Sequence, residues 1–447
     1  MNDGQTAISL IAAPRAPLAR SIAIARDLRI FNPVELSLSS FNSQLVAAHS
    51  LVVPVTMLLG VTRPDAESGT EKEDAADAHD TYNSPRLRRR LILKSLKDRY
   101  GDITQVEHPS SAEDDLSKYN VVHDQELLDF LSTAWDKWVD LGEDGRDINA
   151  SSQRAGDVGG DDANSIPGLI PINFALHRNS QERPGHSVYG GIAYYCTDMC
   201  TPIVSSLLDE LKWDGAVVKM AVEQAVVATA TDGDADGPHI RATYAITTHP
   251  GHHAASDSYG GYCYVNHAAR AAREMQKLLG DDAKIAILDV DYHCGNGTAA
   301  IFYTDANIWV TSLHCDPNFD YPFTSGFADQ IGEGSGWGST MHMPLPPRTS
   351  WDKYEEALSV AMDAITTGFG AQGLIVSLGL DTYEGDEVAT KRAGFQLSKD
   401  DYKKMGALIG SKTDVPCVFI QEGGYKMEVV GDAAADVVAS FCRAKAG

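Results

Sequence analysis

Five apolar runs of strand length recur along the second half of the chain, and helical patterns separate most of them. Apolar positions repeat at helical spacing in 266–279 and 351–367. Ser398 is a suitable N-cap for a further helix that runs to Gly410. Because strands that alternate with helices predict βαβ units, we expect an α/β fold with one large, doubly wound, mainly parallel sheet and helices on both faces. The apolar runs are Arg241–Thr248, Lys284–Val290, Ile308–Leu313, Gly373–Leu380 and Val415–Ile420.

The polar residues that could carry chemistry follow directly after these runs. In a doubly wound sheet, ligands bind in the crevice beyond the carboxyl ends of the strands. Residues that follow different strands can therefore meet in one site. The segments expected to meet there are His249–His253, Asp289–His293, Ser312–His314, Asp381–Asp386 and Gln421–Tyr425.

A metal site is the first prediction at this edge of the sheet. Asp291 and His293 are separated by one residue, so in an extended segment both side chains point the same way, and Asp381 follows another run. One imidazole and two carboxylates suit Zn²⁺, Fe²⁺ or Mn²⁺, and three protein ligands leave a position open for water, as in catalytic sites. The alternative is that these residues cap the following helices and bind no metal.

Two adjacent histidines, His252 and His253, follow a Pro-Gly turn and are poor core residues. Beside a metal-bound water they are suited to act as general base and acid. Each needs an acceptor that fixes its tautomer, and Asp289 and Asn296 are the natural partners. The hydroxyl of Tyr425 can donate to a developing oxyanion. The alternatives are two surface histidines in a loop and an ordinary aromatic residue at a helix start.

The chain is acidic, because 62 Asp and Glu residues against 37 Lys and Arg residues give a formal net charge of −25 over 447 residues. This charge repels nucleic-acid phosphates and anionic bilayers, so we expect no direct nucleic-acid partner and no membrane partner. No apolar stretch reaches the ~18–20 residues of a membrane span, and we expect no secretory signal. Seven cysteines, an odd number, favour an intracellular location, in the nucleus or the cytoplasm, over a disulfide framework.

We predict a single catalytic domain over residues 1–447, with loop insertions near 62–80 and 142–191. The first insertion is rich in acidic residues, and the second is rich in Gly, Asp, Ser and Asn. The basic segment Arg86–Arg90 is expected to be a solvated helix face, and a nuclear-import signal is the alternative.

Taken in order, the motifs resemble those of the zinc-dependent histone deacetylases and acetylpolyamine amidohydrolases. The resemblance covers the chain from about Gly190 to the C-terminus, with a weaker match upstream at Val122–Asp124. It implies the arginase–deacetylase fold, and Asn296 together with the Glu-Gly-Gly-Tyr sequence that ends at Tyr425 implies the class II-like and acetylpolyamine branch. The motifs are Pro250–Ala254, Gly261–Cys263, Leu288–Gly297, Ser312–His314, Leu378–Asp386 and Glu422–Tyr425.

The resemblance also implies a role for each matching residue. His253 would be the general base and acid, His252 its electrostatic partner, and Tyr425 the residue that polarises the acetyl carbonyl. The residues that match the ligands of one catalytic Zn²⁺ are Asp291, His293 and Asp381.

Two further sites follow from the same resemblance. Gly261 and Tyr262 match one wall of a substrate tunnel, with Tyr262 in place of the usual Phe, and Tyr321 is expected to supply the facing wall. The family also binds a monovalent cation, usually K⁺, beside the zinc. The residues that match this second cation site are Asp289, Asp291, His293, Ser312 and Leu313.

The leading expectation is zinc-dependent hydrolysis of the acetyl amide of Nε-acetyl-lysine in histone or non-histone proteins, with release of acetate. Histone tails are then expected partners, and chromatin regulation is the expected context. The alternative is an acetylpolyamine amidohydrolase that acts on small acetylated amines. A third possibility is a manganese ureohydrolase, but it would need a two-metal carboxylate cluster that the sequence lacks. The last alternative is a non-catalytic protein that keeps the fold.

Overall fold

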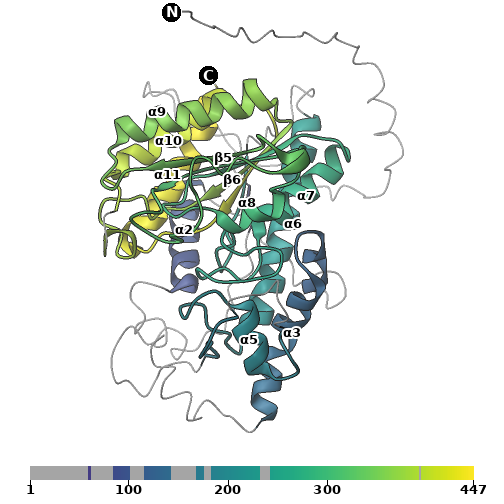
Figure 1. The fold of residues 1–447 in the computed structure, drawn as a ribbon. Helices are drawn as coiled ribbons and strands as arrows, with labels where there is room; N and C mark the ends of the chain where they lie inside the picture. The colour runs from purple at the N-terminus through teal and green to yellow at the C-terminus, as the bar shows by residue number, and fades with distance from the viewer. Residues whose placement is uncertain are drawn as a thin grey trace, which may run out of the picture. The chain divides into compact units, whose positions relative to one another are not determined.

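The computed structural model of this chain describes residues 59–61, 84–100, 115–141, 168–175, 183–231, 242–391 and 394–446 (Figure 1). Every described residue belongs to one compact unit, Val52–Gly447. The insertion expected at 62–80 lies outside the described residues, as do 142–167 and 176–182 of the second insertion. The single domain over residues 1–447 stays a prediction.

The described part of the chain contains a seven-stranded sheet in which all neighbouring strands run parallel. The strand order is β1-β2-β7-β6-β3-β4-β5: from β3 the chain moves outward through β4 to β5, and it then returns to place β6 and β7 between β3 and β2. This topology confirms the doubly wound, parallel α/β sheet that the sequence predicted. The strands are β1 (Leu59–Val61), β2 (Thr243–Ala245), β3 (Ile285–Asp289), β4 (Ile308–Cys315), β5 (Thr340–Leu345), β6 (Gly373–Leu378) and β7 (Cys417–Gln421).

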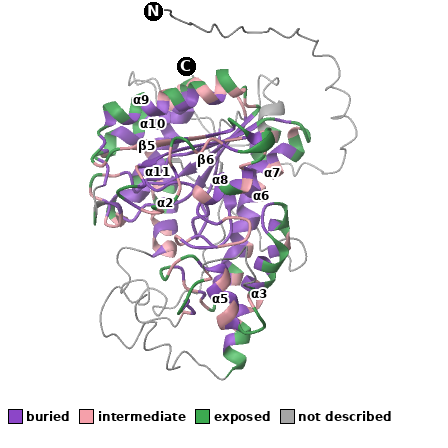
Figure 2. Ribbon diagram, in the orientation of Figure 1, coloured by how far each residue is buried: buried purple, intermediate pink, exposed green. Residues whose placement is uncertain are grey.

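The two faces of the sheet bury separate hydrophobic clusters, because alternate residues of a strand point to opposite faces. In β3, Ile285 and Ile287 pack into the first cluster, while Ala286 and Leu288 pack into the second. Both faces are covered, and this explains why the strands appear in the sequence as continuous apolar runs rather than alternating ones. Figure 2 shows the central strands as buried.

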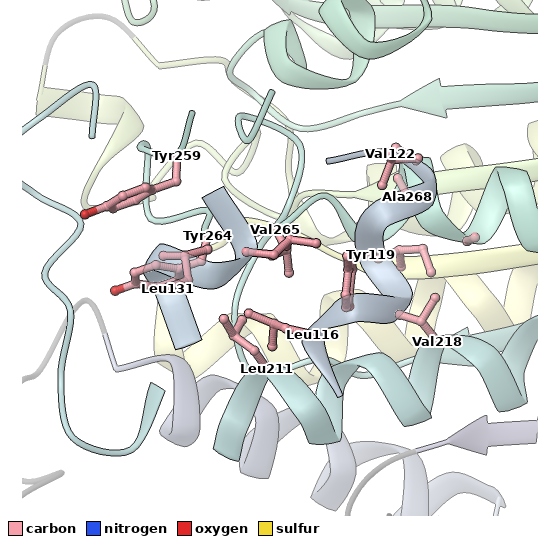
Figure 3. Close-up of a cluster of buried hydrophobic side chains, with 14 of the residues drawn as sticks. Leu116, Tyr119, Val122, Leu131, Leu211, Val218, Tyr259, Tyr264, Val265 and Ala268 are labelled. Carbon is pink, nitrogen blue, oxygen red and sulfur yellow. The ribbon is translucent and has the colours of Figure 1, made fainter. Parts of the chain in front are cut away.

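Helices of the middle of the chain cover the first face. In part of this cluster, Leu116 and Tyr119 of the 3₁₀ helix Leu116–Val121 gather with Leu211 and Val218 (Figure 3). The helices that contribute to the cluster are α3 (Gln125–Asp140), α5 (Val188–Tyr195), α6 (Leu207–Thr231), α7 (His267–Leu279) and α8 (Asn296–Phe302).

The second face is covered mainly by helices of the C-terminal part, with α9 and α10 lying above the sheet in Figure 1. Helix α10 begins after Ser398, which forms a capping box with Asp401. Helices α10 and α11 pack closely, since a Cβ at Gly406 would overlap the carbonyl oxygen of Val437. The helices of this face are α2 (Pro85–Tyr100), α9 (Trp351–Asp363), α10 (Lys399–Lys412) and α11 (Met427–Ala446).

The helices predicted from apolar spacing are present with small shifts at their ends. Asn266 caps α7 by accepting from the amide of Ala269, and Gly280 ends it with a φ of +127°. Helix α9 ends at Asp363 and continues as a π-helical turn over Ala364–Phe369, which ends at Gly370 with a φ of +72°.

Several elements differ from the sequence expectations. The edge strands β1 and β5 were not predicted, because β1 is very short and β5 contains Pro344 and polar residues. The prediction of a loop that extends through Gly191 is wrong from Val188 onward. Helix α5 begins there, and the side chain of Ser187 caps it. Two glycines inside α5 weaken its helical pattern.

The interpretation of Arg86–Arg90 as a solvated helix face is also wrong. Arg88 and Arg89 are only 2% and 4% exposed, and Arg86 pairs with the buried Glu210 at 2.6 Å. No helix among the described ranges has the length and apolar content needed to cross a membrane.

The strand register decides which polar residues become neighbours. Asp289 at the end of β3 lies opposite Ser312 of β4 and Ser377 of β6. Leu378 of β6 lies opposite Gln421 of β7, so the loops that begin at Gly379 and Glu422 leave the sheet side by side. The loops after β3, β6 and β7 therefore open onto the same edge.

Candidate active site

Asp291, His293 and Asp381 converge beyond the ends of β3 and β6. Their donor atoms all lie within 4.8 Å of one another. His293 Nδ1 is 3.0 Å from Asp381 Oδ2 and 3.3 Å from Asp291 Oδ1. The structure thus brings together the three residues that the sequence suggested as metal ligands.

Backbone amides hold both carboxylates in place. The amide of Gly423 donates to Asp291 Oδ2 over 2.9 Å, and the amide of Tyr292 donates to Asp381 Oδ1 over 2.9 Å. A Cβ at Gly423 would lie 2.6 Å from Asp291 Oδ2 and 2.8 Å from Asp381 Oδ2. Glycine at position 423 therefore keeps the space between the two carboxylates free.

This group of side chains fits a divalent cation. Asp291 and Asp381 are 1% and 0% exposed, and burial together with the charge of Asp291 raises the pKa of Asp381 to about 7. Buried carboxylates this close together repel each other unless a cation neutralises them. Two carboxylates and one imidazole without a thiolate form a donor set that Zn²⁺ accepts.

The two adjacent histidines receive different partners. His252 Nδ1 lies 2.9 Å from Asp289 Oδ2, and His253 Nδ1 lies 2.7 Å from Asn296 Oδ1. The ring centroids of the histidines are only 3.9 Å apart. The sequence suggested Asp289 and Asn296 as the orienting residues, and the structure shows which residue orients which ring.

These partners give the two rings opposite charge preferences. Burial opposes a charge on His252, but Asp291 and Asp289 outweigh it and raise the pKa of His252 to about 10. Burial and the neighbouring positive charge of His252 lower the pKa of His253 well below its usual value. Near pH 7, His252 is therefore the cation and His253 the neutral imidazole, which is the form that accepts a proton.

Tyr425 is placed by the turn that follows β7. Its amide donates to Asp386 Oδ2 over 2.7 Å, and the side chain is only 3% exposed. Burial raises the pKa of its hydroxyl well above the usual value, so the group remains a protonated donor. Such a donor is suited to an oxygen that gains negative charge.

The expected tunnel residues surround the same histidines. Gly261 has a φ of +59°, and a Cβ there would overlap the imidazole ring of His253. The ring of Tyr262 lies 5.8 Å from that of Tyr425, and the ring of Tyr321 lies 4.8 Å from that of His253. Two aromatic rings thus contact different members of the site, as walls of one pocket would.

The residues matched to the monovalent cation site are also close together. Asp289 and Ser312 are opposite each other in the register of β3 and β4, and the amide of Asp291 donates to Asp289 Oδ1 over 3.0 Å. Leu313, next to Ser312 in β4, is fully buried. The structure brings these residues to one place beside the group that fits the divalent cation.

Three residues with no assigned role also support the site. Glu422 accepts from the amide of His252 over 3.1 Å and from that of Gly251 over 2.6 Å. Asp386 fixes Tyr425, and Arg88 lies 5.7 Å over the ring of Tyr425. Glu422 and Asp386 stand within the quoted motifs, which was the available signal, whereas no local pattern links Arg88 to this site.

The chain matches the family model described as the histone deacetylase domain over residues 82–441. It is 36% identical over 319 residues to an acetylpolyamine amidohydrolase of Mycoplana ramosa, covering 71% of this chain and 81% of the relative. It is 29% identical over 194 residues to histone deacetylase 8 of Arabidopsis thaliana, covering 42% of this chain and 50% of the relative. The crystal structure of acetylpolyamine aminohydrolase from Burkholderia pseudomallei matches with a TM-score of 0.68 and 24% identity, covering 87% of this chain and 99% of that chain.

The chain belongs to the histone deacetylase family, since the family model spans most of its length. Membership in this family supports the conclusion that the protein is a hydrolase that removes acetyl groups. The similarity to the Burkholderia pseudomallei structure supports the arginase–deacetylase fold expected from the motifs. The Mycoplana ramosa relative, which matches 71% of this chain, is named for acetylpolyamines rather than histones. The similarities therefore favour the alternative substrate class over the leading expectation of acetyl-lysine in proteins.

Replacing Asn296 with Asp should move the acid limb of the kcat/KM profile to higher pH by roughly one unit or more, because a carboxylate against Nδ1 raises the pKa of His253. His253 must be neutral to accept a proton, so a higher pKa removes activity at a higher pH. Deacetylation rates measured against pH test this effect, with Asn307→Asp, just before β4, as a control that leaves the limb in place. An acid limb that does not move in Asn296→Asp would contradict the role of His253.

Proposed function

We propose that this protein hydrolyses the acetyl amide of small acetylated amines, foremost acetylated polyamines, with a zinc ion as cofactor. The observation that carries this proposal is the match to an acetylpolyamine amidohydrolase over 71% of this chain and 81% of that relative. The match to a plant histone deacetylase is confined to 42% of the chain. The net charge of −25 is compatible with a cationic amine as substrate.

Zinc would be held by Asp291, His293 and Asp381, the buried group whose donor atoms converge within 4.8 Å. When bound there, it would polarise the acetyl carbonyl and acidify a water molecule. We also propose a structural K⁺ ion at Asp289, Asp291, His293, Ser312 and Leu313, supported by the adjacent ends of β3 and β4.

His253 is the general base in this proposal. Its Nδ1 is engaged by Asn296 Oδ1, so Nε2 is the atom that takes a proton from the attacking water. The same proton then passes to the amine nitrogen as the amide C–N bond breaks, and acetate and the free amine leave. His252, held as a cation by Asp289, stabilises the negative charge that forms beside it.

Tyr425 is the oxyanion donor in this proposal. Its protonated hydroxyl donates to the acetyl oxygen as that oxygen gains charge. The rings of Tyr262 and Tyr321 would flank the methylene chain of the amine, since aliphatic chains pack well between aromatic faces.

We propose a reducing intracellular compartment for this enzyme. All seven cysteines are free thiols, and all except Cys200 are buried. The proposal covers the nucleus and the cytoplasm alike, since both keep thiols reduced. A direct action on histone tails in chromatin regulation is not part of it, because the similarities favour polyamine substrates.

A substrate comparison tests the main proposal. Zinc-loaded enzyme should deacetylate an acetylated polyamine with a kcat/KM at least about tenfold above that for an Nε-acetyl-lysine peptide of equal net charge. Acetate release is measured for both, with His253→Ala as the background. A higher kcat/KM for the peptide would overturn the proposal and would support a protein lysine deacetylase instead.

Replacing Asp381 with Ala should remove most of the bound zinc from this centre, because only two of the three ligands remain. Zinc per chain is measured by mass spectrometry of purified protein. Asp316→Ala is a matched control, since Asp316 follows β4 and accepts from the amide of Asn318 instead. Full retention of zinc at this centre in Asp381→Ala would refute the ligand role.

Replacing Tyr425 with Phe removes the hydroxyl and keeps the ring. The loss of one oxyanion donor costs roughly 10²–10³ in kcat, so we expect a decrease of that size with zinc content unchanged. Tyr383→Phe, in the loop after β6, is the control and should retain normal turnover. Normal turnover in Tyr425→Phe would show that another group stabilises the oxyanion.

A further inference from the structure

A second group of buried metal-binding side chains lies outside the catalytic residues. Cys294, His314 and His342 come from the loop after β3, from β4 and from β5, and all three are buried. One donor atom from each lies within 4.8 Å of the other two. The group contains a thiol and no carboxylate, so its chemistry differs from that of Asp291, His293 and Asp381.

The spacing of this group matches a tetrahedral metal centre. Cys294 Sγ lies 3.5 Å from His342 Nδ1. Zinc–sulfur and zinc–nitrogen bonds of about 2.3 Å and 2.0–2.1 Å at a tetrahedral angle separate sulfur from nitrogen by about 3.5 Å. The two atoms therefore already have the separation that a shared zinc ion requires.

Gly326 leaves space where the donors meet. Its φ is +103°, and a Cβ there would lie 2.7 Å from His314 Nε2 and 2.9 Å from Cys294 Sγ. Both donor atoms thus face one point from which any side chain is excluded.

The ring of His314 can present a lone pair to this point. Its Nδ1 lies 2.9 Å from Ser312 Oγ and 3.1 Å from the carbonyl oxygen of Ser312, and either oxygen can accept a hydrogen bond from Nδ1–H. A metal-binding histidine commonly donates its other N–H to such a carbonyl group. In the opposite tautomer, Nε2 donates instead to the carbonyl oxygen of Gly326, 2.8 Å away, and no metal binds.

We propose that Cys294, His314 and His342 bind a second transition-metal ion, with Zn²⁺ as the natural occupant. The thiol of Cys294 loses its proton to solvent on binding, and both histidines bind as neutral imidazoles. A thiolate and two imidazoles are a borderline-to-soft set that selects against Mg²⁺, Ca²⁺ and K⁺.

The other thiol-containing group of the described residues is a weaker candidate. His252, Cys263 and Glu422 also converge, but His252 is bound to Asp289 and Glu422 accepts from two backbone amides and from Ser377. These partners occupy the atoms that a metal ion would need. Cys294 and His342 contact each other instead, with Cys294 Sγ 3.5 Å from His342 Nδ1.

A metal ion at the second group would stabilise the walls of the active site. Cys294 is bonded directly to His293, and Gly326 lies in the same loop as Tyr321. An ion that joins the loop after β3 to β4 and β5 therefore fixes the position of a catalytic ligand and limits the movement of the tunnel wall. Its role is structural and separate from the substrate proposed above.

Cobalt substitution distinguishes the two metal centres. Apoenzyme loaded with Co²⁺ should bind about two equivalents per chain. It should also show a near-ultraviolet charge-transfer band, which needs a thiolate and so cannot come from the catalytic group. Cys294→Ser should lose the band and one equivalent, whereas Asp381→Ala should lose one equivalent and keep the band. Cys417→Ser is the matched control with a buried cysteine and should keep both.

A second variant distinguishes a specific loss of metal binding from a loss caused by misfolding. His342→Asn should keep the circular dichroism spectrum of the parent, lose about one equivalent of zinc and lower the midpoint of thermal unfolding. A parent protein that binds one equivalent of cobalt without a thiolate band would overturn the proposal. So would a Cys294→Ser protein that keeps both the stoichiometry and the band.

Discussion

The site depends on several carboxylates buried at one edge of a parallel sheet. Asp289, Asp291 and Asp381 are at most 1% exposed, and burial of charge is costly unless cations and hydrogen bonds offset it. Backbone amides after β3 and β7 donate to these oxygens, and His252 supplies one positive charge. The remaining negative charge explains why this edge of the sheet is suited to bind metal cations.

The same charges separate the roles of two adjacent histidines. His252 lies against a carboxylate and becomes a cation, whereas His253 lies against an amide oxygen and is kept neutral by burial and by the charge of His252. A small difference in partner, Asp289 or Asn296, therefore produces an electrostatic group and a base within 3.9 Å of each other. Glu422 fixes the turn that carries them, because its carboxylate binds the backbone of both Gly251 and His252.

Much of the fold could be predicted from local patterns. Buried parallel strands give apolar runs, and Asn266, Ser398 and Gly280 mark the ends of helices α7 and α10. The edge strands β1 and β5 and the glycine-containing helix α5 were missed, because their local signals are weak and tertiary packing stabilises them. The burial of Arg88 was missed for a similar reason, since its partners Thr248 and Gly424 are distant in the sequence.

The sequence by itself determined the chemistry available at the carboxyl edge of the sheet, because every candidate ligand, base and donor follows a recognisable strand. Only the tertiary structure decided the pairing: Asp289 with His252, Asn296 with His253, and Asp386 with Tyr425. It also brought Cys294, His314 and His342 together across three elements. The physical reason is that these contacts depend on strand order and register, which arise when long segments of chain pack and are not encoded in any local pattern.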